Sequence, residues 1–334
     1  MAETATINGT DLAYIEHGRG QPVVLVHGGV GDYRAWDLQM PAVAASFRTI
    51  ALSCRGAWPN RKLEPDEEIT LDTFVEDLAS FIKALDLAPV HLVGHSSPGG
   101  FGGLLLAHRH PELLRSLVLL EPPAFPLLGV DIPPTPPQVL KLLARNPRAG
   151  IGFIKFGARG IGPAMKAFNR GDDEGGLRTF MSAVAGKERV ASIPEETFQA
   201  FVGNVGPFKA QLRAGFPQFG EDDARSIRVP TLLVSGAETP TPLTAVIDRL
   251  EKLLPDVNRL NIAGASHNMF NSHPAEFNAG VMDFIGQHRP RDADPSGPDQ
   301  RRRPERRETA PWRLTGSPVR SEGQLELSDF DRDP

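Results

Sequence analysis

Three glycine-containing segments hold the residues whose types and spacing suit chemistry. They are HGG at His27–Gly29, GHSSPGG with Ser96 and Ser97, and GASH ending at His267. A serine hydroxyl is a weak nucleophile at neutral pH. It needs a base within hydrogen-bond reach, a third group that orients the base, and backbone N–H donors for the developing oxyanion. A serine, a histidine and glycine-rich turns meet most of these needs and predict nucleophilic attack on a carbonyl.

Each of these segments follows an apolar run that is typical of a buried strand. The runs are PVVLV, PVHLV and VNRLNI, and FRTIALS, SLVLLEPP and VPTLLVSG are further runs of this kind. Helical patterns such as LDTFVEDLASFIKAL alternate with them, and ATINGTDLAYIEHG indicates a hairpin turning at Asn8–Gly9. Alternating strands and helices predict an α/β fold with a doubly wound, mostly parallel sheet, whose ligands bind at the carboxyl ends of the strands.

Residues 123–225 interrupt this alternation. They are rich in proline, glycine and phenylalanine and contain helical patterns such as PQVLKLLARN, but no convincing strand pattern. We expect a helical cap inserted over a substrate pocket, and the alternative is a helical subdomain that only adds stability. The predicted core is therefore residues 1–122 and 226–288, with the cap at 123–225.

The order of the three segments, with a donor loop, then a serine turn, then a late histidine, resembles the α/β-hydrolase family. The resemblance extends over residues 5–288, and VHGG, VGHS and LVLLEPP are most like segments of cap-bearing, esterase-like serine hydrolases. It implies a Ser-His-acid triad and an acyl-enzyme, with no metal and no cofactor. It also implies that Gly29 and the residue after the nucleophile supply the oxyanion hole. We expect substrate contacts from His27, Gly28 and Phe125.

The spacing of the glycines does not choose between the two serines. Gly94 precedes Ser96 as in the usual Gly-x-Ser-x-Gly turn, whereas Gly99 follows Ser97 at that spacing. The backbone N–H after the nucleophile decides between them. Pro98 has no N–H, so an attacking Ser97 would lose a donor worth roughly 10²–10³ in rate. We therefore expect Ser96 to attack and Ser97 to donate its N–H, with Ser97 as the alternative nucleophile.

His267 occupies the place where the resemblance puts the base, whereas the acid has two candidates. Relatives usually carry Asp after the strand VPTLLVSG, but this chain has Thr239 there, which has no carboxyl group. Glu238 is one residue earlier, and Glu121 ends the run SLVLLEPP, to which some relatives move the acid. A carboxylate that ends an apolar strand is costly to bury without a partner, and His267 would be that partner. We therefore expect Glu121, with Glu238 as the alternative.

The composition bears on partners and compartment. The formal net charge of −5 gives no reason to expect nucleic acid. No apolar run approaches the roughly 20 residues of a membrane helix, and the first residues lack the pattern of a signal peptide. Cys54 is the only cysteine, which fits a reducing compartment. We expect a soluble, cytoplasmic protein without nucleic-acid or membrane partners, and the sequence does not indicate its oligomeric state.

Residues 289–334 differ in composition from the rest of the chain. They are rich in proline and charged residues, include the run RRRPERR, and have few apolar side chains. Such a segment cannot bury enough apolar surface to fold alone. We therefore expect a disordered, charged tail in which the basic run is solvated.

Together these features predict a serine hydrolase. It would act on an ester-like carbonyl, in a carboxylic ester or a lactone, of a small-to-medium apolar substrate. The family also includes carbon–carbon bond hydrolases and cofactor-free haloperoxidases, which the motifs do not separate. A non-catalytic ligand-binding protein of the same fold is the alternative from another class. Dehalogenases and epoxide hydrolases are disfavoured, because those relatives use Asp as the nucleophile.

Overall fold

The computed structural model describes residues 2–64 and 67–289, and the contacts group the chain up to Arg289 into one compact unit. From residue 290 on, the predicted tail lies outside the described residues. The fold is built on an eight-stranded sheet with the order β1-β2-β4-β3-β5-β6-β7-β8. The strands are β1 (Glu3–Ile7), β2 (Thr10–His17), β3 (Pro22–Val26), β4 (Arg48–Leu52), β5 (Val90–His95), β6 (Leu114–Leu120), β7 (Thr231–Gly236) and β8 (Val257–Ile262).

The strand directions confirm the predicted fold class. Strands β1, β2 and β4 pair antiparallel, and every pairing from β4 through β8 is parallel. The hairpin between β1 and β2 turns at Asn8 and Gly9, which both have positive φ, as the Asn-Gly pair predicts. The carboxyl ends of the parallel strands therefore meet at one edge of the sheet.

Helices cover both faces of the sheet, and this explains why its central strands are apolar throughout. Alternate side chains of a strand point to opposite faces. Val24 and Leu92 pack in the core with α2 and α3, whereas Val23 and Val93 pack in a second core with α1 and α14. The helices around the sheet are α1 (Met40–Ala44), α2 (Leu71–Ala84), α3 (Gly99–Arg109), α12 (Thr241–Leu253), α13 (Met269–Ser272) and α14 (Pro274–Gln287).

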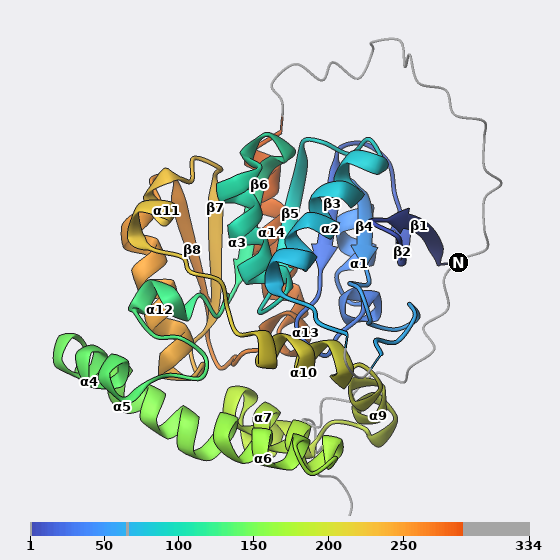
Figure 1. Cartoon of the computed structure of the whole chain (residues 1–334). Coiled ribbons are helices and arrows are strands. Elements are labelled where there is room, and N and C mark those ends of the chain that lie inside the picture. The colour runs from blue at the N-terminus through green and yellow to red at the C-terminus, as the bar shows by residue number, and fades with distance from the viewer. Residues whose placement is uncertain (1, 65–66, 290–334) are drawn as a thin grey trace, which may run out of the picture. The chain divides into compact units, whose positions relative to one another are not determined.

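Between β6 and β7 the described residues form helices and turns but no strand. In Figure 1 the helices α4–α10 lie across one end of the sheet, and we call them the inserted helices. No helix in the described part of the chain is both long and apolar enough to cross a bilayer. The helices of this segment are α4 (Pro136–Arg145), α5 (Pro147–Phe156), α6 (Gly162–Phe168), α7 (Asp173–Ala185), α8 (Lys187–Ala191), α9 (Glu195–Gly203), α10 (Val205–Ala214) and α11 (Glu221–Ser226).

Candidate active site

Ser96 lies in the turn between β5 and α3, at the carboxyl edge of the sheet. Its φ is +49°, in the left-handed region that residues other than glycine seldom adopt. The turn is held on both sides. The Ser96 N–H donates to Leu120 O at 2.8 Å, and Ser96 O accepts from the Phe101 N–H at 2.8 Å. A left-handed serine between a strand and a helix has the geometry that exposes a hydroxyl group above a sheet.

Two glycines allow α3 to begin directly against the strands. A methyl group on Gly94 would lie 2.1 Å from Gly99 O, and one on Gly99 would lie 2.2 Å from Val26 O. Neither position therefore accepts a side chain. The Gly99 N–H also donates to His27 O at 3.1 Å. This close approach ties the serine turn to the loop that follows β3.

The two neighbouring serines differ in accessibility. Ser97 is 6% exposed, and its Oγ is buried without a hydrogen-bond partner among the described residues. Ser96 is half-buried. Pro98 stands at the N-cap of α3, where its missing N–H breaks no hydrogen bond within the helix. Ser96 is thus the more exposed residue of the two, and the residue that follows it has a backbone N–H.

The loop after β3, residues 27–32, comes close to both serines, and we call it the donor loop. A methyl group added at Gly28 would lie 3.2 Å from Ser96 Cβ, and one added at Gly29 would lie 3.5 Å from Ser97 O. The structure therefore brings the two predicted oxyanion donors, Gly29 and Ser97, together beside Ser96. Their role as donors to an oxyanion stays a prediction.

His267 and Glu121 form a hydrogen-bonded pair at the same edge of the sheet. His267 lies in the loop after β8, Glu121 directly follows β6, and His267 Nδ1 is 2.6 Å from Glu121 Oε2. A carboxylate only accepts hydrogen bonds, so the contact places the imidazole proton on Nδ1 and leaves Nε2 as the basic nitrogen. This is the arrangement in which a histidine takes a proton from a serine.

The carboxylate of Glu121 is fully buried and has three hydrogen-bond donors. Besides His267, the Gly236 N–H donates to Oε1 at 2.9 Å, and the Thr239 hydroxyl donates to the same oxygen. Charge-assisted hydrogen bonds of this kind offset the cost of removing a carboxylate from water. Thr239, at the place of the usual aspartate, therefore helps to hold Glu121. The sequence pattern did not predict this role for Thr239, although its hydroxyl group stands where relatives carry the aspartate.

Glu238, the alternative acid, points elsewhere. Its carboxylate forms an ion pair with Arg189 of α8, and the two side chains are 54% and 43% exposed. Arg189 also donates to Gly264 O at 3.1 Å. Of the two candidate acids, Glu121 is the one that contacts His267.

His95 is a further member of this site that the sequence analysis did not single out. Its Nε2 is 3.0 Å from His267 O, and the two ring centroids are 4.6 Å apart. Removal of the ring from water, together with the nearby His267, lowers the pKa of His95 well below its usual value. The neutral ring therefore donates from Nε2 and holds the backbone of the predicted base. Its position next to Ser96 was the signal that could have identified it.

His27 is buried, and both of its ring nitrogens contact the backbone. It is 1% exposed, its Nε2 accepts from the Cys54 N–H at 3.0 Å, and its Nδ1 is 2.7 Å from Gly28 O. Burial lowers the pKa of His27, so the ring is neutral and donates from Nδ1. Because both ring nitrogens bind the backbone, His27 braces the donor loop, and its contact with substrate stays a prediction.

Aromatic rings of the inserted segment lie over this region. A methyl group on Gly29 would lie 2.7 Å from the Phe208 ring, and the ring centroids of Phe208 and Phe180 are 4.7 Å apart. Phe125 is 3% exposed and packs edge-on against Phe153 at 4.9 Å. Phe208 therefore makes the cover of the donor loop apolar, whereas the contact of Phe125 with substrate stays a prediction.

Asn204 connects the inserted helices to the donor loop. It lies between α9 and α10, is 1% exposed, and donates from Nδ2 to Asp32 Oδ2 at 2.9 Å and to Val30 O at 3.2 Å. Its Oδ1 accepts from the Trp58 N–H at 2.8 Å. One buried amide thus holds the segment that directly follows Gly29.

If Gly29 stabilises an oxyanion as predicted, Asn204→Ala should lower kcat roughly tenfold, because the loop that carries the Gly29 N–H loses its support. The rate is measured per active site, titrated with a phosphonate, so that misfolded protein does not contribute. Asn169→Ala, at the exposed end of α6, is the matched control and should behave as the wild type. An unchanged kcat in Asn204→Ala would show that the loop holds its position without this contact.

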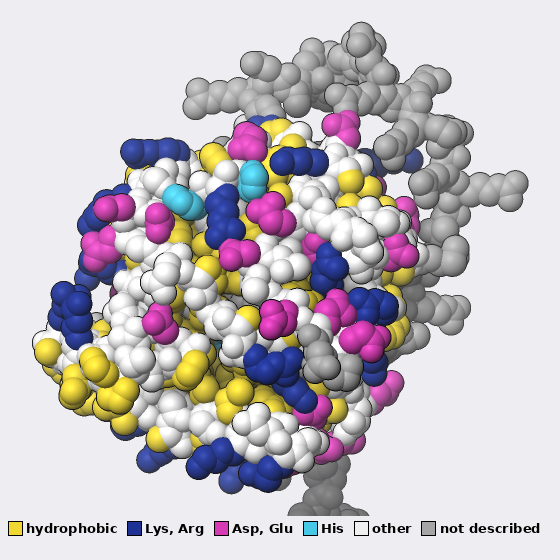
Figure 2. All heavy atoms as spheres, viewed as in Figure 1, with side chains coloured by type: hydrophobic (Ala, Val, Ile, Leu, Met, Phe, Trp, Pro, Cys, Tyr) yellow, Lys and Arg dark blue, Asp and Glu magenta, His cyan; other side chains and the backbone are white. Residues whose placement is uncertain are grey.

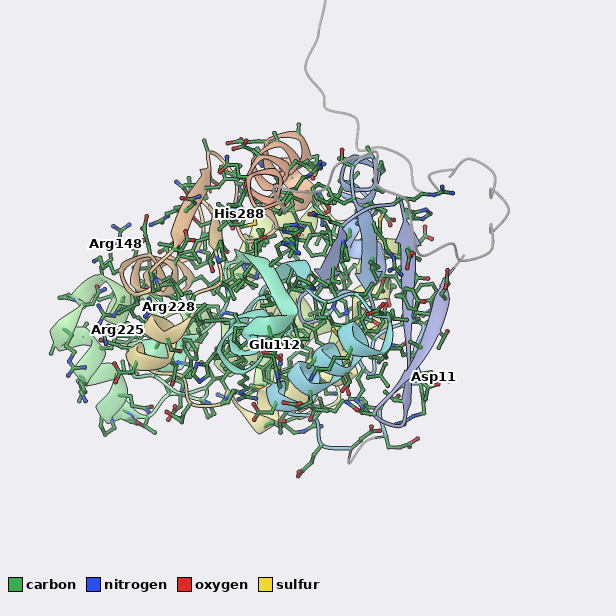
Figure 3. The ribbon with its side chains drawn as sticks, turned by 90° about the horizontal axis from the view of Figure 1, so that it is seen from above. Asp11, Glu112, Arg148, Arg225, Arg228 and His288 are labelled. Atoms are coloured by element: carbon green, nitrogen blue, oxygen red, sulfur yellow. The ribbon has the colours of Figure 1, made fainter. Side chains whose placement is uncertain are left out.

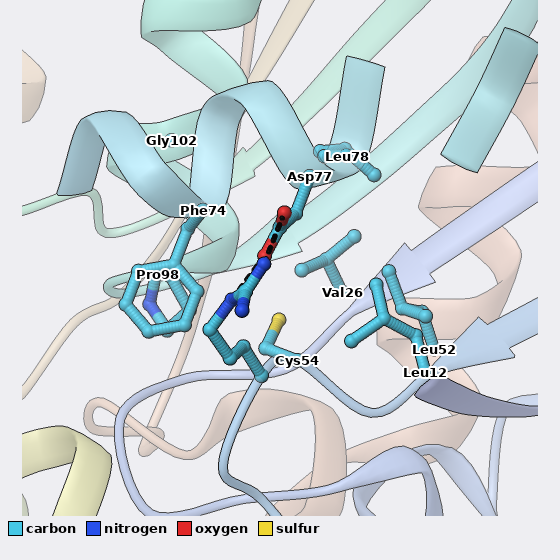
Figure 4. Close-up of a pocket in the computed structure, with 10 residues that line it drawn as sticks. Leu12, Val26, Leu52, Cys54, Phe74, Asp77, Leu78, Pro98 and Gly102 are labelled. Carbon is cyan, nitrogen blue, oxygen red and sulfur yellow. Dashed lines mark hydrogen bonds and ion pairs between the residues drawn. The ribbon is translucent and has the colours of Figure 1, made fainter. Parts of the chain in front are cut away.

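The cavities near the site do not identify a substrate pocket. One, of about 10 Å³, lies beneath the serine turn and is lined by Cys54, Pro98 and the Arg55–Asp77 ion pair (Figure 4). It has room for about one water. Burial, with the nearby Asp77 charge, raises the pKa of the Cys54 thiol, which keeps it unreactive. A second cavity, of about 240 Å³, borders Thr239, but its lining includes neither of the predicted reacting groups.

Metal binding finds no support in these residues. Within residues 2–64 and 67–289, no group of three or more His, Cys, Asp or Glu side chains is arranged to hold a metal ion.

Comparison with known proteins agrees with this architecture. The profile of the alpha/beta hydrolase family matches residues 23–280. The 2-hydroxy-6-oxo-6-(2'-aminophenyl)hexa-2,4-dienoic acid hydrolase of Metapseudomonas resinovorans is 27% identical over 283 residues, which are 84% of this chain and 89% of the relative. The non-heme chloroperoxidase CPO-A1 of Kitasatospora aureofaciens is 28% identical over 299 residues, 86% of this chain and 100% of the relative.

A solved structure shows the same fold. The enol-lactonase from Burkholderia xenovorans LB400 superposes with a TM-score of 0.62 at 21% identity, and the match covers 85% of this chain and 100% of the lactonase. The family profile spans most of the sheet and all three of the segments from which the candidate site is built. This chain belongs to the α/β-hydrolase family.

Proposed function

We propose that this α/β-hydrolase is a serine hydrolase that cleaves an ester-like carbonyl, in a carboxylic ester or a lactone, through an acyl-enzyme. The observation that carries the proposal is the His267–Glu121 hydrogen bond of 2.6 Å at the sheet edge that also holds the left-handed turn of Ser96. A base oriented by a buried acid, at the sheet edge that holds an accessible serine, is the arrangement that serine hydrolysis requires.

The proposed reaction has two halves. Ser96 Oγ attacks the carbonyl carbon while His267 Nε2 takes the hydroxyl proton, and Glu121 stabilises the imidazolium that forms. The N–H groups of Gly29 and Ser97 bind the oxyanion. The C–O bond to the leaving group then breaks, and His267 returns its proton to the departing alcohol. In the second half, His267 takes a proton from water, the water oxygen attacks the acyl carbon, and Ser96 Oγ recovers the proton as the acid leaves.

The surroundings of the donor loop support an apolar acyl group. Phe208 lies against Gly29, and Phe180 packs against Phe208, so a substrate held at the oxyanion site would meet aromatic carbon. A small-to-medium apolar substrate suits such a cover. The single, buried cysteine supports work in a reducing compartment such as the cytoplasm.

A carbon–carbon bond hydrolase is the second candidate. The observation that favours it is the 27% identity to the dienoic acid hydrolase of Metapseudomonas resinovorans, which extends over 84% of this chain. The same serine, base and oxyanion donors would serve that reaction, and the leaving group would depart as a carbon atom. Only the substrate separates the two candidates.

The test is turnover of p-nitrophenyl butyrate, followed by a panel of esters of increasing acyl length, lactones and a vinylogous 1,5-diketone. We expect the wild type to hydrolyse the short and medium esters and His267→Ala to lose at least ~10³-fold in kcat. Cleavage of the diketone with no ester turnover would favour the second candidate. Tight binding of panel members with no turnover would overturn both and indicate a ligand-binding protein.

A further inference from the structure

The segment that contains the inserted helices α4–α6 has only basic charged side chains. From residue 132 to residue 171 the sequence has seven lysines and arginines and no Asp or Glu, although the whole chain has a net charge of −5. All seven side chains are exposed. Some exposed arginines elsewhere, such as Arg178 and Arg225, pair with carboxylates, whereas no ion pair among the described residues includes any of these seven. They are Lys141, Arg145, Arg148, Lys155, Arg159, Lys166 and Arg170.

Large apolar side chains are exposed among these cations. Leu140 is 65% exposed, Ile151 47% and Ile154 50%, and these are three of the five large apolar side chains that are exposed in the described part of the chain. Figure 2 shows hydrophobic side chains gathered over α4 and α5, with Lys and Arg side chains beside and below them. In Figure 3, where the molecule is seen from above, Arg148 lies at its outer rim.

Along α5 and α6 the exposed cations lie beside the exposed apolar side chains. Helix α5, the π-turn Gly157–Ile161 and α6 follow each other without a break, so this stretch is roughly 33 Å long at 1.5 Å per residue. Its exposed residues recur at helical spacing at 148, 151, 155, 159, 163, 166 and 170, whereas Phe153, Phe156 and Ala164 are buried against the protein. We call the exposed side of α4–α6 the basic face.

We propose that the basic face docks on the surface of an anionic lipid bilayer. Leu140, Ile151 and Ile154 would enter the headgroup region, and the surrounding cations would face the lipid phosphates and carboxylates. Amphipathic helices with Lys and Arg on the polar side and apolar side chains beside them bind membranes in this way. Each basic residue near such a surface contributes roughly a fivefold factor to the partition coefficient.

The charge argues against a second copy of this chain as the occupant. In a symmetric dimer the same patch contacts itself, so the cations of one basic face would lie against those of the other. Like charges in such a contact are repelled rather than attracted. An anionic bilayer complements both the charge and the exposed aliphatic side chains.

This docking needs no membrane-spanning segment. The sequence led us to expect no membrane partner because no apolar run is long enough to span, but binding at the interface depends on a folded, amphipathic face. The inference concerns binding alone, so it holds or fails independently of the proposed hydrolysis.

The test is sedimentation of the full-length protein with vesicles of phosphatidylcholine and with vesicles of phosphatidylcholine mixed with phosphatidylserine. We expect binding to the anionic vesicles only, and weaker binding as salt is raised. Lys155→Glu combined with Arg159→Glu should lower the partition coefficient at least ~25-fold. Ile151→Ser combined with Ile154→Ser should lower it roughly tenfold.

The matched control is Lys83→Glu combined with Lys252→Glu, which reverses two exposed charges on α2 and α12 and should bind as the wild type does. Circular dichroism and the melting temperature verify that every variant is folded. The inference is overturned if anionic vesicles do not bind the wild type, or if the basic-face variants bind as strongly as the control. Basic-face variants that bind as strongly as the control would assign the binding to another basic segment, such as residues 301–307. A wild-type dimer that the Ile151/Ile154 variant dissociates would also overturn it.

Discussion

Ser96→Ala is expected to lower kcat for p-nitrophenyl butyrate by at least ~10⁴-fold, whereas Ser97→Ala should keep most of the activity. The difference follows from the atoms that each serine contributes. In the proposed reaction Ser96 supplies its hydroxyl oxygen, which alanine lacks. Ser97 supplies only a backbone N–H, which alanine retains, and its own hydroxyl group is buried. Steady-state kinetics of the two variants, prepared in parallel, measures the difference.

A covalent adduct gives an independent answer. A phosphonate that mimics the tetrahedral intermediate should modify the wild type on Ser96, and peptide mass spectrometry locates the modified residue. The Ser97→Ala variant should be modified at the same place, and Ser96→Ala should not react. An adduct on Ser97, or a greater loss of kcat in Ser97→Ala, would mean that the turn presents the other hydroxyl group to the base.

The second large effect is expected at the acid. Glu121→Gln should lower kcat by roughly 10³–10⁴-fold, because the amide of glutamine is able to donate to His267 Nδ1 and so to favour the tautomer that cannot act as a base. Glutamine has nearly the same size as glutamate, so the buried site keeps its shape. Glu238→Gln removes only an exposed carboxylate that pairs with Arg189, and its kcat should stay close to that of the wild type.

The pair of variants also tests the alternative assignment. Both substitutions remove one negative charge and leave the side-chain volume almost unchanged, so the comparison isolates the position of the carboxylate. KM for both should remain near the wild-type value, since neither side chain is expected to bind the substrate. A greater loss of kcat in Glu238→Gln than in Glu121→Gln would assign the role of the acid to Glu238.

The donor loop connects the chemistry to the inserted helices. Asn204 holds the residues after Gly29, and Phe208 lies directly against Gly29. A displacement of the helices α9 and α10 would therefore move the loop that carries Gly29, the predicted oxyanion donor, together with the ring of Phe208 that covers it.

The features that the sequence by itself determined follow from interactions between residues that are close in the chain. The alternation of strands and helices, the Asn8–Gly9 hairpin and the left-handed turn around Ser96 depend on neighbours in the chain, and the structure has each of them. The preference for Ser96 came from one covalent fact, the missing N–H of Pro98. The preference for Glu121 came from the cost of burying a carboxylate, and that side chain is indeed fully buried against His267.

Only the tertiary structure decided how distant residues share their hydrogen bonds. Thr239 donates to Glu121, which is 118 residues away, and Asn204 donates to Asp32 across 172 residues. No periodicity or spacing predicts such contacts, because they depend on which loops the sheet order brings to one edge. The backbone role of His27 and the basic face have the same origin. Burial of one side of a helix, and with it the exposure of the other, is settled only when the helix has packed.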